Sequence, residues 1–514
     1  MRDRHVVVVG AGIGGLAAAA VLAHDGLRVT VLERASRPGG KLRTLDAGGL
    51  AVDAGPTVFT LRPWFEALFD RVGASLGDAL HLRPLPLLAR HAWSDSARLD
   101  LHPDLDATVD AIGTFAGAAE GRRYRHFCER SRRIFEALEA PYMRAPRPNP
   151  LTLVARAGLR GLPAMLRISP FARLWRELEQ EFADPRLRQL FGRYATYCGS
   201  SPWLAPATLM LIAHAERAGV WRVDGGMVRI ADALAGLATA RGATLRCAAP
   251  VARIRVAHGR ASGVELDDGE RIDADAVLFN GDAAALARGL LGDPARAAVP
   301  ATGPRQRSLS AITWTGLARV RGFPLAHHVV CFGDDSAREF ADLFDARHLP
   351  GSPTVYLCAQ DRDGDDFVPH AERLLCLVNA PATGDEGGPS AEEIDACERA
   401  TFEQLRRCGL ALEWIPSTLQ RTTPATFEAL FPGTGGALYG RATHGWRASF
   451  QRPGSRSRIP GLFLAGGSVH PGPGLPMAAT SGWLAAEAIL AQSATRTSIS
   501  GWTPAATPGG ISTP

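Results

Sequence analysis

Three glycines near the start of the chain, Gly10, Gly12 and Gly15, have the spacing G-x-G-x-x-G. They follow four consecutive valines (6–9) and precede an Ala/Leu-rich stretch (16–23), which predicts a buried strand, a tight turn and a helix. In such a turn the first glycine permits the reversal, the second lets a pyrophosphate approach the backbone, and the third allows close packing of helix against strand. The helix N-terminus would then favour an anion.

A carboxylate follows the next predicted strand. Residues 28–32 read Arg-Val-Thr-Val-Leu, and Glu33 comes directly after them. An acid at this point of a dinucleotide-binding unit accepts hydrogen bonds from the adenosine ribose. The glycines alone could form an ordinary turn without a ligand, but strand, turn, helix, strand and acid in this order predict a bound dinucleotide.

The segment after Glu33 favours FAD over NAD. An NAD-binding unit would continue into its next crossover helix, whereas this chain has the pair Gly39-Gly40 followed by Lys41 and Arg43. Two cations would thus lie close to the expected position of the pyrophosphate, although a solvated loop is the alternative for such a charged stretch. Residues 53–57, Asp-Ala-Gly-Pro-Thr, resemble the turn by which flavoproteins return the chain to the isoalloxazine ring.

A second glycine-rich segment lies near the end of the chain. Residues 461–468 read as a strand that ends in glycines, residues 470–476 are rich in proline and glycine, and a helix is predicted over 477–490. A strand leading into a helix N-terminus can hold the ribityl chain and pyrimidine edge of a flavin and stabilise the negative charge of its reduced form. A surface loop of turn residues is the alternative. The predicted FAD-binding residues are Gly10, Gly12, Ile13, Gly14, Gly15, Glu33, Arg34, Gly40, Lys41, Leu42, Arg43, Gly55, Pro56, Thr57, Val251, Gly466, Gly467, Ser468, Pro476 and Met477.

The elements that must position these residues indicate an α/β fold. With 514 residues, 46% hydrophobic and 21% charged, the chain has the composition of a globular protein of several units. We expect an FAD-binding Rossmann-type domain, of the glutathione-reductase-like kind, with an inserted α+β substrate domain. A strand meander over 243–280 would complete the FAD domain and bring Val251 beside the adenine. The expected parts are 1–95, 215–290 and 455–492 for the FAD domain, 96–214 for helices facing substrate and membrane, 291–454 for the substrate-domain sheet, and 493–514 for a disordered tail.

The net charge and the cysteine spacing bear on whether the protein binds nucleic acid and on the cellular compartment where it is expected. The net charge of +5 is too small to require nucleic acid. The eight cysteines show no C-x-x-C spacing, which predicts reduced thiols and an intracellular protein. The uncharged run 6–23 behind Arg2 and Arg4 could be read as a signal peptide or a short membrane helix. Its change from valines to glycines to an Ala/Leu stretch favours the strand, turn and helix.

Neither a metal site nor a catalytic side chain is predicted. Asp361, Asp363, Asp365 and Glu372 match four positions of a calcium loop, but Asp366 stands where that loop requires glycine and the flanks read as strands. A solvated hairpin loop fits better. His327 and His328, adjacent in an expected strand, would point to opposite faces and so would not share a metal. We find no Ser/His/Asp or Cys/His arrangement that the sequence alone would bring together.

These motifs resemble the bacterial-type phytoene desaturase family of carotenoid oxidoreductases. The resemblance rests on residues 10–15 with Glu33, on 39–41, and on the signature-like stretch 461–481. Within that stretch Val469 and Pro473 depart from the family pattern, which prefers a small residue at each position, or a threonine at the first. The segments 423–427, 432–433 and 436–440 are also similar, so that the resemblance covers nearly the whole chain before its tail.

A narrower resemblance links the chain to the hydroxyneurosporene/methoxyneurosporene desaturases of purple bacteria. It is carried by residues 53–58, 143–148 and 184–197. The resemblance implies FAD-dependent introduction of the 3,4 double bond into acyclic 1-hydroxy- or 1-methoxy-carotenoids. Alternatives are a phytoene desaturase or carotenoid isomerase of the same family, an amine-oxidase-like flavoenzyme, or a non-catalytic lipid-escort protein. The sequence does not identify the electron acceptor.

A lipid-dissolved substrate requires access to a membrane. Between Ala140 and Arg176 the chain has seven arginines and no acidic residue, interspersed with leucines. Four prolines in 141–150 and Pro163 interrupt any spanning helix. We therefore expect a short amphipathic element on the membrane surface, with Arg156, Arg160 and Arg167 at anionic headgroups. The alternative is an arginine-rich face that covers the substrate domain. The expected location is the cytoplasm, with peripheral attachment to the inner or photosynthetic membrane.

Overall fold

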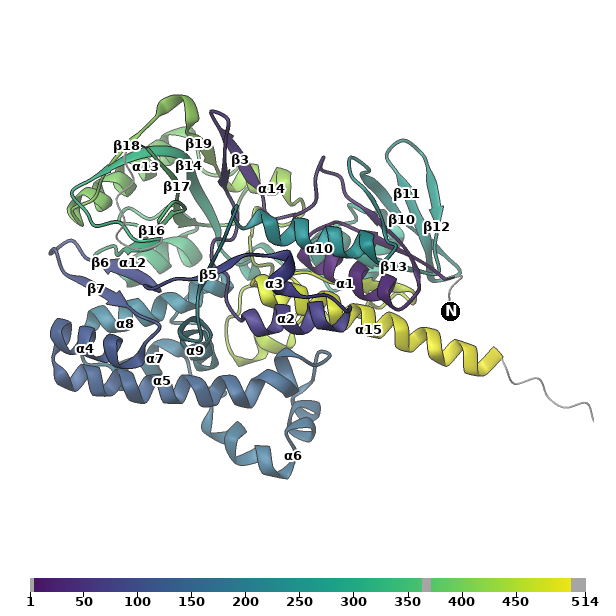
Figure 1. Ribbon diagram of the computed structural model, residues 1–514, viewed down its shortest axis with the longest axis horizontal. Coiled ribbons are helices and arrows are strands. Elements are labelled where there is room, and N and C mark those ends of the chain that lie inside the picture. Colours follow the sequence, from purple (N-terminus) through teal and green to yellow (C-terminus); the bar gives the residue numbers. More distant parts are fainter. Residues whose placement is uncertain (1–3, 363–370, 501–514) are drawn as a thin grey trace, which may run out of the picture.

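The computed structural model describes residues 4–362 and 371–500, apart from the side chains of 159, 160, 162–167 and 493–500. Figure 1 shows three regions: a parallel sheet with its helices beside the N-terminus, a second sheet in green, and a group of blue helices below it. The first and last parts of the chain lie together, because the purple α1 (Ile13–His24) packs against the yellow α15 (Leu475–Ser500).

The first sheet is parallel and buried on both faces. Its central strand, β1, is the valine run of the sequence, and all five of its residues are buried. Helices α1 and α10 (Val228–Ala240) cover one face and strands β10 (Val251–Ala257) and β11 (Arg260–Leu266) pack on the other, and strands buried on both faces require such continuous apolar runs. The strand order is β20-β13-β1-β2-β9. The strands are β1 (His5–Val9), β2 (Arg28–Leu32), β9 (Thr244–Arg246), β13 (Ala276–Phe279) and β20 (Leu462–Leu464).

Helix α1 is enclosed on all sides. It packs against α10 (Val228–Ala240) and α15, so that almost every residue of its Ala/Leu-rich sequence is buried. Its contact with α15 is close because Gly482 faces Gly14: a Cβ on Gly482 would lie 2.0 Å from the carbonyl oxygen of Gly14. Glycine at this position therefore brings the two backbones into contact.

A three-stranded antiparallel sheet continues the same region. It is formed by β10 (Val251–Ala257), β11 (Arg260–Leu266) and β12 (Arg271–Asp273), in that order. The hairpin between the first two strands turns at His258-Gly259, where both residues have positive φ, +50° and +71°. This is the conformation that a two-residue hairpin turn needs, and it matches the meander that the sequence predicts.

The second sheet has eight strands and is built around the long β14 (Ser310–Arg321). Alternating residues in 305–379 predict this sheet, and its strands β14 to β17 lie there. The order is β18-β14-β17-β16-β15-β6-β7, with β19 also paired to β14. The other strands are β15 (His328–Cys331), β16 (Val355–Ala359), β17 (Glu372–Ala380), β18 (Ala411–Trp414), β19 (Gln420–Thr422), β6 (Ala89–Ala92) and β7 (Arg98–Leu101).

The hairpin of β6 and β7 corrects the expected division of the chain. Residues 89–95 were assigned to the first part of the FAD domain and residues from 96 onward to the helical part. Instead, β6 pairs in parallel with β15, and the hairpin extends the second sheet. The four residues of β6 are all buried, as a strand between two neighbours requires. Helix α13 (Ala391–Arg407) contacts β16 and β18 of the same sheet.

The helical region is held by an aromatic core. Phe127, Phe182, Phe191 and Tyr124 form a chain of ring contacts between α5, α7 and α8. Its helices are α4 (Leu105–Ala116), α5 (Ala118–Leu138), α6 (Pro150–Arg167), α7 (Leu174–Glu181), α8 (Pro185–Gly192), the 3₁₀ helix η2 (Arg193–Cys198) and α9 (Leu211–Arg217). In Figure 1, α6 projects below α5, at the edge of the molecule.

Short elements connect these regions. They are β3 (Thr44–Ala47), β4 (Leu50–Asp53), α2 (Arg62–Arg71), α3 (Leu76–Ala79), β5 (Leu82–Pro84), β8 (Trp221–Val223), α11 (Ala283–Ala287), α12 (Ser336–Ala341) and α14 (Pro424–Leu430). The last helix differs from expectation, because α15 continues to Ser500 where the composition predicts disorder from 493. The rest of the expected tail, 501–514, lies outside the described residues.

Candidate cofactor and substrate site

One cavity of about 660 Å³ brings together nearly all of the predicted cofactor residues. The residues of the N-terminal motif, the segment after Glu33, the Gly55–Thr57 turn, Val251 and the Gly466–Ser468 turn all contribute to its lining. Gly15, Pro476 and Met477 are the predicted residues that its lining does not include within the described chain. The cavity extends from β10 to α12, which lie on opposite sides of the molecule in Figure 1.

The turn at Gly12 and the turn at Gly39-Gly40 face each other at the end of the cavity beside helix α1. Gly12 forms an isolated parallel bridge with Gly39, and a Cβ on Gly40 would lie 3.1 Å from the Cα of Gly12. Gly12 itself has φ −74°, and a Cβ there would meet the side-chain nitrogen of Asn280 at 3.0 Å. The turns thus leave bare backbone beside the N-terminus of α1, whose first turn reads Ile-Gly-Gly-Leu. This cradle fits a pyrophosphate.

Gly15 does not face the cavity for a reason that the motif itself gives. A Cβ at this position would lie 2.2 Å from the carbonyl oxygen of Gly10 and 2.9 Å from the Asn280 side chain. Gly15 therefore permits the close packing of α1 against the end of β1, which is the role of the third glycine.

Glu33 is buried at the end of β2 and binds the backbone of the first turn. One carboxylate oxygen accepts the Ala11 N–H at 2.7 Å, and the other accepts the Ala35 N–H at 3.0 Å. Both bonds hold the carboxylate beside the cavity that it lines. A carboxylate has about four acceptor sites, so capacity remains for a ribose hydroxyl.

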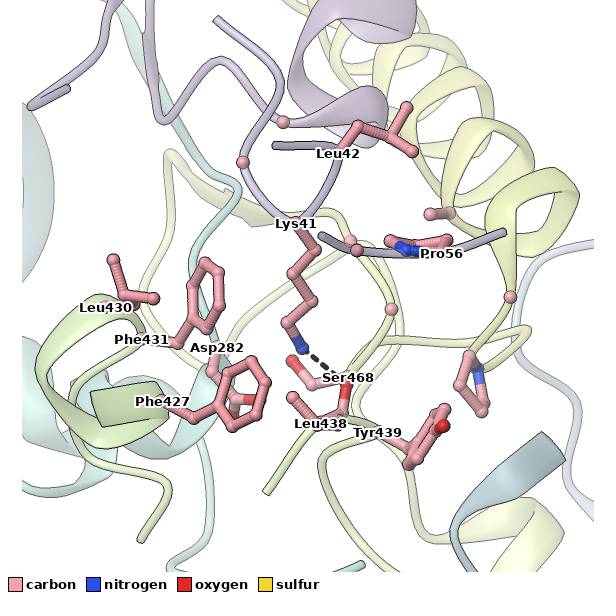
Figure 2. Close-up of a pocket in the computed structure, with 18 of the residues that line it drawn as sticks. Lys41, Leu42, Pro56, Asp282, Phe427, Leu430, Phe431, Leu438, Tyr439 and Ser468 are labelled. Atoms are coloured by element: carbon pink, nitrogen blue, oxygen red, sulfur yellow. Dashed lines mark hydrogen bonds between the residues drawn. The ribbon is translucent and has the colours of Figure 1, made fainter. Parts of the chain in front are cut away.

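Of the three predicted cations, Lys41 is the one whose amino group lies within the cavity. Figure 2 shows its side chain pointing between Phe431 and Tyr439, and its Nζ donates to the Leu438 carbonyl at 2.5 Å. Burial lowers the pKa of Lys41, against the opposing charge of Asp282. Arg34 and Arg43 also contribute to the lining: Arg34 donates to carbonyls of α14, and Arg43 donates to Thr422.

The C-terminal turn follows β20 and is fixed from two sides. The Gly466 N–H donates to Ser481 Oγ at 2.7 Å, and Ser468 Oγ accepts the Ala283 N–H at 3.1 Å. Behind this turn the buried Arg452 guanidinium donates to the carbonyls of Tyr439, Arg441 and Gly467. This arrangement holds the glycine turn against the segment that carries Tyr439.

Helix α15 presents other residues to the cavity than the sequence predicts. Pro473, Gly474, Leu475 and Ala478 line it. Because the helix begins at Leu475, two positions earlier than predicted, Met477 points away and packs against the core of the helical region. The exact start of a helix sets which face each residue occupies, since each position turns about 100°.

Asn280 is a site residue that the motifs do not reveal. It follows β13, whose sequence Ala-Val-Leu-Phe is wholly buried, and its Nδ2 donates to the Gly10 carbonyl at 3.1 Å. Its Oδ1 is buried beside Gly466 and has no hydrogen-bond partner among the described residues. A buried acceptor without a donor, facing a cavity, fits a bound polar ligand. The buried strand followed by Asn-Gly-Asp is the sequence signal that could have identified it.

Beyond the glycine turns, the cavity continues between the second sheet and the helical region. Its lining there is mainly apolar and aromatic, and comes from η2, α8, α12, α14, β16 and β17. Two hydroxyls connect this part to the turn at Pro56: Thr57 Oγ1 lies 2.6 Å from Tyr356 OH, and Tyr356 OH lies 2.8 Å from His328 Nδ1. The Arg193 guanidinium lies over the Tyr356 ring at 5.4 Å.

Glu339 provides a carboxylate at the α12 side of the cavity. It is 2% exposed and accepts hydrogen bonds from the Thr354 N–H at 3.1 Å and the Thr354 hydroxyl at 2.7 Å. Burial raises the pKa of Glu339 to about 7. A partly neutral carboxyl of this kind can both accept and donate hydrogen bonds near neutral pH.

The argument against a shared metal at His327 and His328 is wrong in its geometry. Strand β15 begins at His328, so His327 lies just before the strand and does not follow its alternation. The two rings lie 4.6 Å apart, and Cys358 of β16 completes a buried cluster with them.

Of the calcium-like positions, Asp361 forms an ion pair with Arg373 and Glu372 forms one with Arg362, while Asp363 and Asp365 lie outside the described residues.

The arginine-rich segment includes α6, which is kinked at Gly158. Among residues 4–362 and 371–500, no helix is long and apolar enough to cross a bilayer. The segment nevertheless exposes large apolar side chains: Leu151 is 82% exposed, Phe171 72% and Val154 46%. Arg156 is also exposed and donates to carbonyls of Pro141 and Pro146.

Comparisons with known proteins agree with this geometry. Residues 13–490 match the family model of flavin containing amine oxidoreductases. The chain is 54% identical to a hydroxyneurosporene desaturase of Rubrivivax gelatinosus, over 96% of this chain and 94% of that protein. It is 48% identical to a hydroxyneurosporene desaturase of Cereibacter sphaeroides, over 96% of this chain and 98% of that protein. A 1-hydroxycarotenoid 3,4-desaturase of a Flavobacterium strain is 30% identical, over 95% and 99%.

Solved structures share the fold at much lower identity. An oxidoreductase from Methanosarcina mazei superposes with a TM-score of 0.59 at 17% identity, over 95% of this chain and all of that one. A putrescine oxidase bound to putrescine gives a TM-score of 0.58 at 18% identity, over 95% and 99%. Because the family is flavin-containing, FAD is the cofactor of this chain. The chain belongs to the flavin-containing amine oxidoreductases and, within them, to the family of the hydroxyneurosporene desaturases.

Proposed function

We propose that this protein introduces the 3,4 double bond into acyclic carotenoids that carry a 1-hydroxy or 1-methoxy end group. The full-length identity of 54% to a hydroxyneurosporene desaturase is the observation that carries this proposal. The cavity supports it, because its lining beyond the glycine turns is mainly apolar and aromatic, as a polyene requires. The predicted cofactor residues that line the cavity, together with Asn280, are proposed to hold FAD.

The proposed reaction removes a hydride and a proton from adjacent carbons. Bound FAD supplies the two-electron hydride acceptor. The protein excludes water from the reacting end through its apolar lining, so that the cation left on the polyene is not captured by water. That cation is delocalised and loses its adjacent proton readily. The proton is finally released to solvent, and the hydroxyls of Thr57 and Tyr356 at the cavity wall can relay it along their mutual hydrogen bond.

Glu339 and Thr354 are proposed to bind the oxygen at the substrate end. Both line the cavity, and both are held by their mutual hydrogen bonds on the α12 side. A hydroxyl placed there finds a hydrogen-bond partner, whereas a hydrocarbon end would cover the remaining acceptor positions of the Glu339 carboxyl without offering a donor. A site built to hydrogen-bond a hydroxyl discriminates strongly against the analogue that lacks it.

The test compares three carotenoids with the flavin-loaded enzyme. We expect 1-hydroxyneurosporene to gain a double bond, detected by chromatography and its shifted absorption, and neurosporene and phytoene to react at least tenfold more slowly. Glu339→Leu should lower the ratio of the rate with 1-hydroxyneurosporene to the rate with neurosporene. Its affinity for FAD should stay close to that of wild type. Conversion of phytoene alone would overturn the proposed substrate and indicate a phytoene desaturase.

We further propose that the segment 140–176 attaches the protein to an anionic membrane surface. Exposed Leu151, Val154 and Phe171 would insert beneath the headgroups, with arginines such as Arg156 beside the phosphates. The isolated position of α6 at the edge of the molecule supports this role. Such attachment would give a lipid-dissolved substrate a route to the cavity.

Vesicle flotation tests the membrane proposal. We expect binding to vesicles containing phosphatidylglycerol, weakened by salt and reduced severalfold in a Leu151→Ser/Phe171→Ser variant. Leu50, which is 52% exposed outside this segment and outside the cavity lining, provides the matched control Leu50→Ser, which should bind as wild type does. Equal binding of the double variant and wild type would remove this segment as the docking surface.

A further inference from the structure

His327, His328 and Cys358 form a buried cluster at the junction of β15 and β16. His328 and Cys358 lie directly opposite each other in the antiparallel register, which places their side chains on one face of the sheet. His327 joins them from the residue before β15. One nitrogen of each imidazole and the Cys358 sulfur lie within 4.8 Å of one another, and all three residues are buried.

The outer nitrogen of each imidazole is engaged away from the cluster. His327 Nδ1 lies 2.9 Å from the Arg362 carbonyl, and His328 Nδ1 lies 2.8 Å from Tyr356 OH. A ring nitrogen bonded to an outer oxygen fixes the tautomer and directs the other nitrogen inward, as in metal sites of proteins. His327 Nε2 accordingly lies 3.7 Å from Cys358 Sγ.

His328 Nε2 is the second, independent observation. This atom is buried and has no hydrogen-bond partner in the part of the chain that the structure describes. His328 as a whole is 4% exposed. Burying a polar nitrogen without a hydrogen-bond partner is energetically unfavourable, so the position calls for a partner. Because Nδ1 is engaged by Tyr356, Nε2 is the His328 nitrogen that remains available to a ligand of the cluster.

We propose that His327, His328 and Cys358 bind a single Zn²⁺ ion through Nε2, Nε2 and Sγ. Two imidazoles and one thiolate suit zinc, with bonds of about 2.0–2.3 Å. The observed sulfur–nitrogen separation of 3.7 Å is close to that between two ligands of one tetrahedral zinc ion. Binding forms the Zn–S bond and releases the proton of the Cys358 thiol, so that the charge in the cluster rises by one.

The burial and the nearby carboxylates disfavour a free Cys358 thiolate and favour a bound cation beside it. Burial raises the pKa of the Cys358 thiol, and the negative charges of Asp53 and Asp361 add to the effect. Those same carboxylates would stabilise the net positive charge of a zinc ion bound to one thiolate. Arg193 is a cation that acts on His328 from the cavity side. The cluster is distinct from the flavin cavity, whose described lining includes none of the three ligands.

A zinc ion here would join β15 to β16 behind the substrate cavity. It would hold the His328 ring, and through it Tyr356 OH, which contacts Thr57 at the cavity wall. The proposed role is therefore structural: the metal fixes the position of one aromatic wall of the cavity without touching substrate.

The experiment is metal analysis of the full-length protein with its flavin, produced without a polyhistidine tag and purified without chelator. We expect about one zinc per chain by mass spectrometry, and a cobalt-substituted protein with a visible cobalt–thiolate charge-transfer band. Cys358→Ser and His328→Gln should each lower zinc at least tenfold. Cys376→Ser is the matched control, because Cys376 is a buried cysteine of the neighbouring strand β17 outside the cluster.

Zinc below about 0.1 per chain in wild type, after growth with added zinc, would overturn the proposal, as would full zinc retention in Cys358→Ser. Copper or iron at the same ratio would overturn the assignment of the metal. If the variants do not fold, the metal content and cobalt spectrum of wild type decide alone. Added zinc should also raise the melting temperature of chelator-treated wild type and not that of a folded Cys358→Ser.

Discussion

A valine at Gly12 should separate flavin binding from folding. The backbone at Gly12 has φ −74° and ψ 172°, which any residue can adopt, and the nearest protein atom to a new Cβ is the Asn280 side-chain nitrogen at 3.0 Å. The folded protein can accommodate the side chain if Asn280 moves by a few tenths of an ångström. The branched side chain would, however, occupy the cradle between Gly12 and Gly40.

The expected magnitude follows from the bonds that the cradle offers. A hydrogen bond from backbone N–H to a charged phosphate contributes about 1.5–3 kcal/mol, so losing one raises the Kd for FAD by about 10- to 150-fold. Stability without flavin should fall by about 1 kcal/mol, since valine is a poorer N-terminal cap of a helix than glycine. The melting temperature of the flavin-free protein should therefore change by less than about 4 °C.

The assay is fluorescence titration of flavin-free protein with FAD, alongside thermal melting. Substitutions at two other glycines serve as controls, one that should impair folding and one that should be neutral. Gly15→Ala places its Cβ 2.2 Å from the Gly10 carbonyl oxygen and should reduce folded protein regardless of flavin, whereas Gly236→Ala, with open space around its Cβ in α10, should leave affinity unchanged. If Gly12→Val binds FAD with wild-type affinity, the pyrophosphate does not lie against this turn.

Two further perturbations test the polar interior. The pKa of Glu339 is raised to about 7 from an ordinary 4.5, so its stabilising effect is complete below pH 4.5 and is lost as pH rises through 7. Urea unfolding should show wild type losing on the order of 3 kcal/mol over this range relative to Glu339→Gln, and parallel pH curves would contradict the raised pKa. Arg452→Lys should destabilise the protein by about 2–3 kcal/mol in the same assay, because one ammonium cannot serve carbonyls of Tyr439, Arg441 and Gly467 together, while the exposed Arg447→Lys should be neutral. Equal stability of these two variants would show that the Arg452 contacts contribute nothing net.

The nucleotide half of the fold could be predicted because its signals are local. The valine strand, the glycine turn and Glu33 lie within a few turns of one another, and the structure has β1, α1 and β2 where the pattern places them. The site residues that the sequence did not reveal depend on long-range packing. Asn280 is brought to Gly10 because β13 pairs with β1, and no local motif encodes that pairing.

The structure differs from the sequence-based expectation where an offset of one or two residues changes which way a side chain points. Pro476 and Met477 are predicted to bind FAD; the lining of the cavity contains their neighbours Leu475 and Ala478 instead, and contact of residues 476 and 477 with FAD stays a prediction. His327 was placed in a strand that begins at His328, and the resulting argument from alternation separated two rings that lie together. The hairpin of β6 and β7 was missed as part of the second sheet, because its partner β15 lies far along the sequence.

The contact between Gly14 and Gly482 constrains how the protein is made. Helix α1 (Ile13–His24) is synthesised long before helix α15 (Leu475–Ser500), which packs against it. At about 5–20 residues per second, an apolar helix waits roughly half a minute to a minute and a half for its partner. Nascent chains must therefore be shielded during that interval, and messenger truncated before codon 482 should yield aggregated or degraded fragments. We expect flavin to be retained only after Gly466–Ser468 has been synthesised, because this turn contributes to the lining of the cavity.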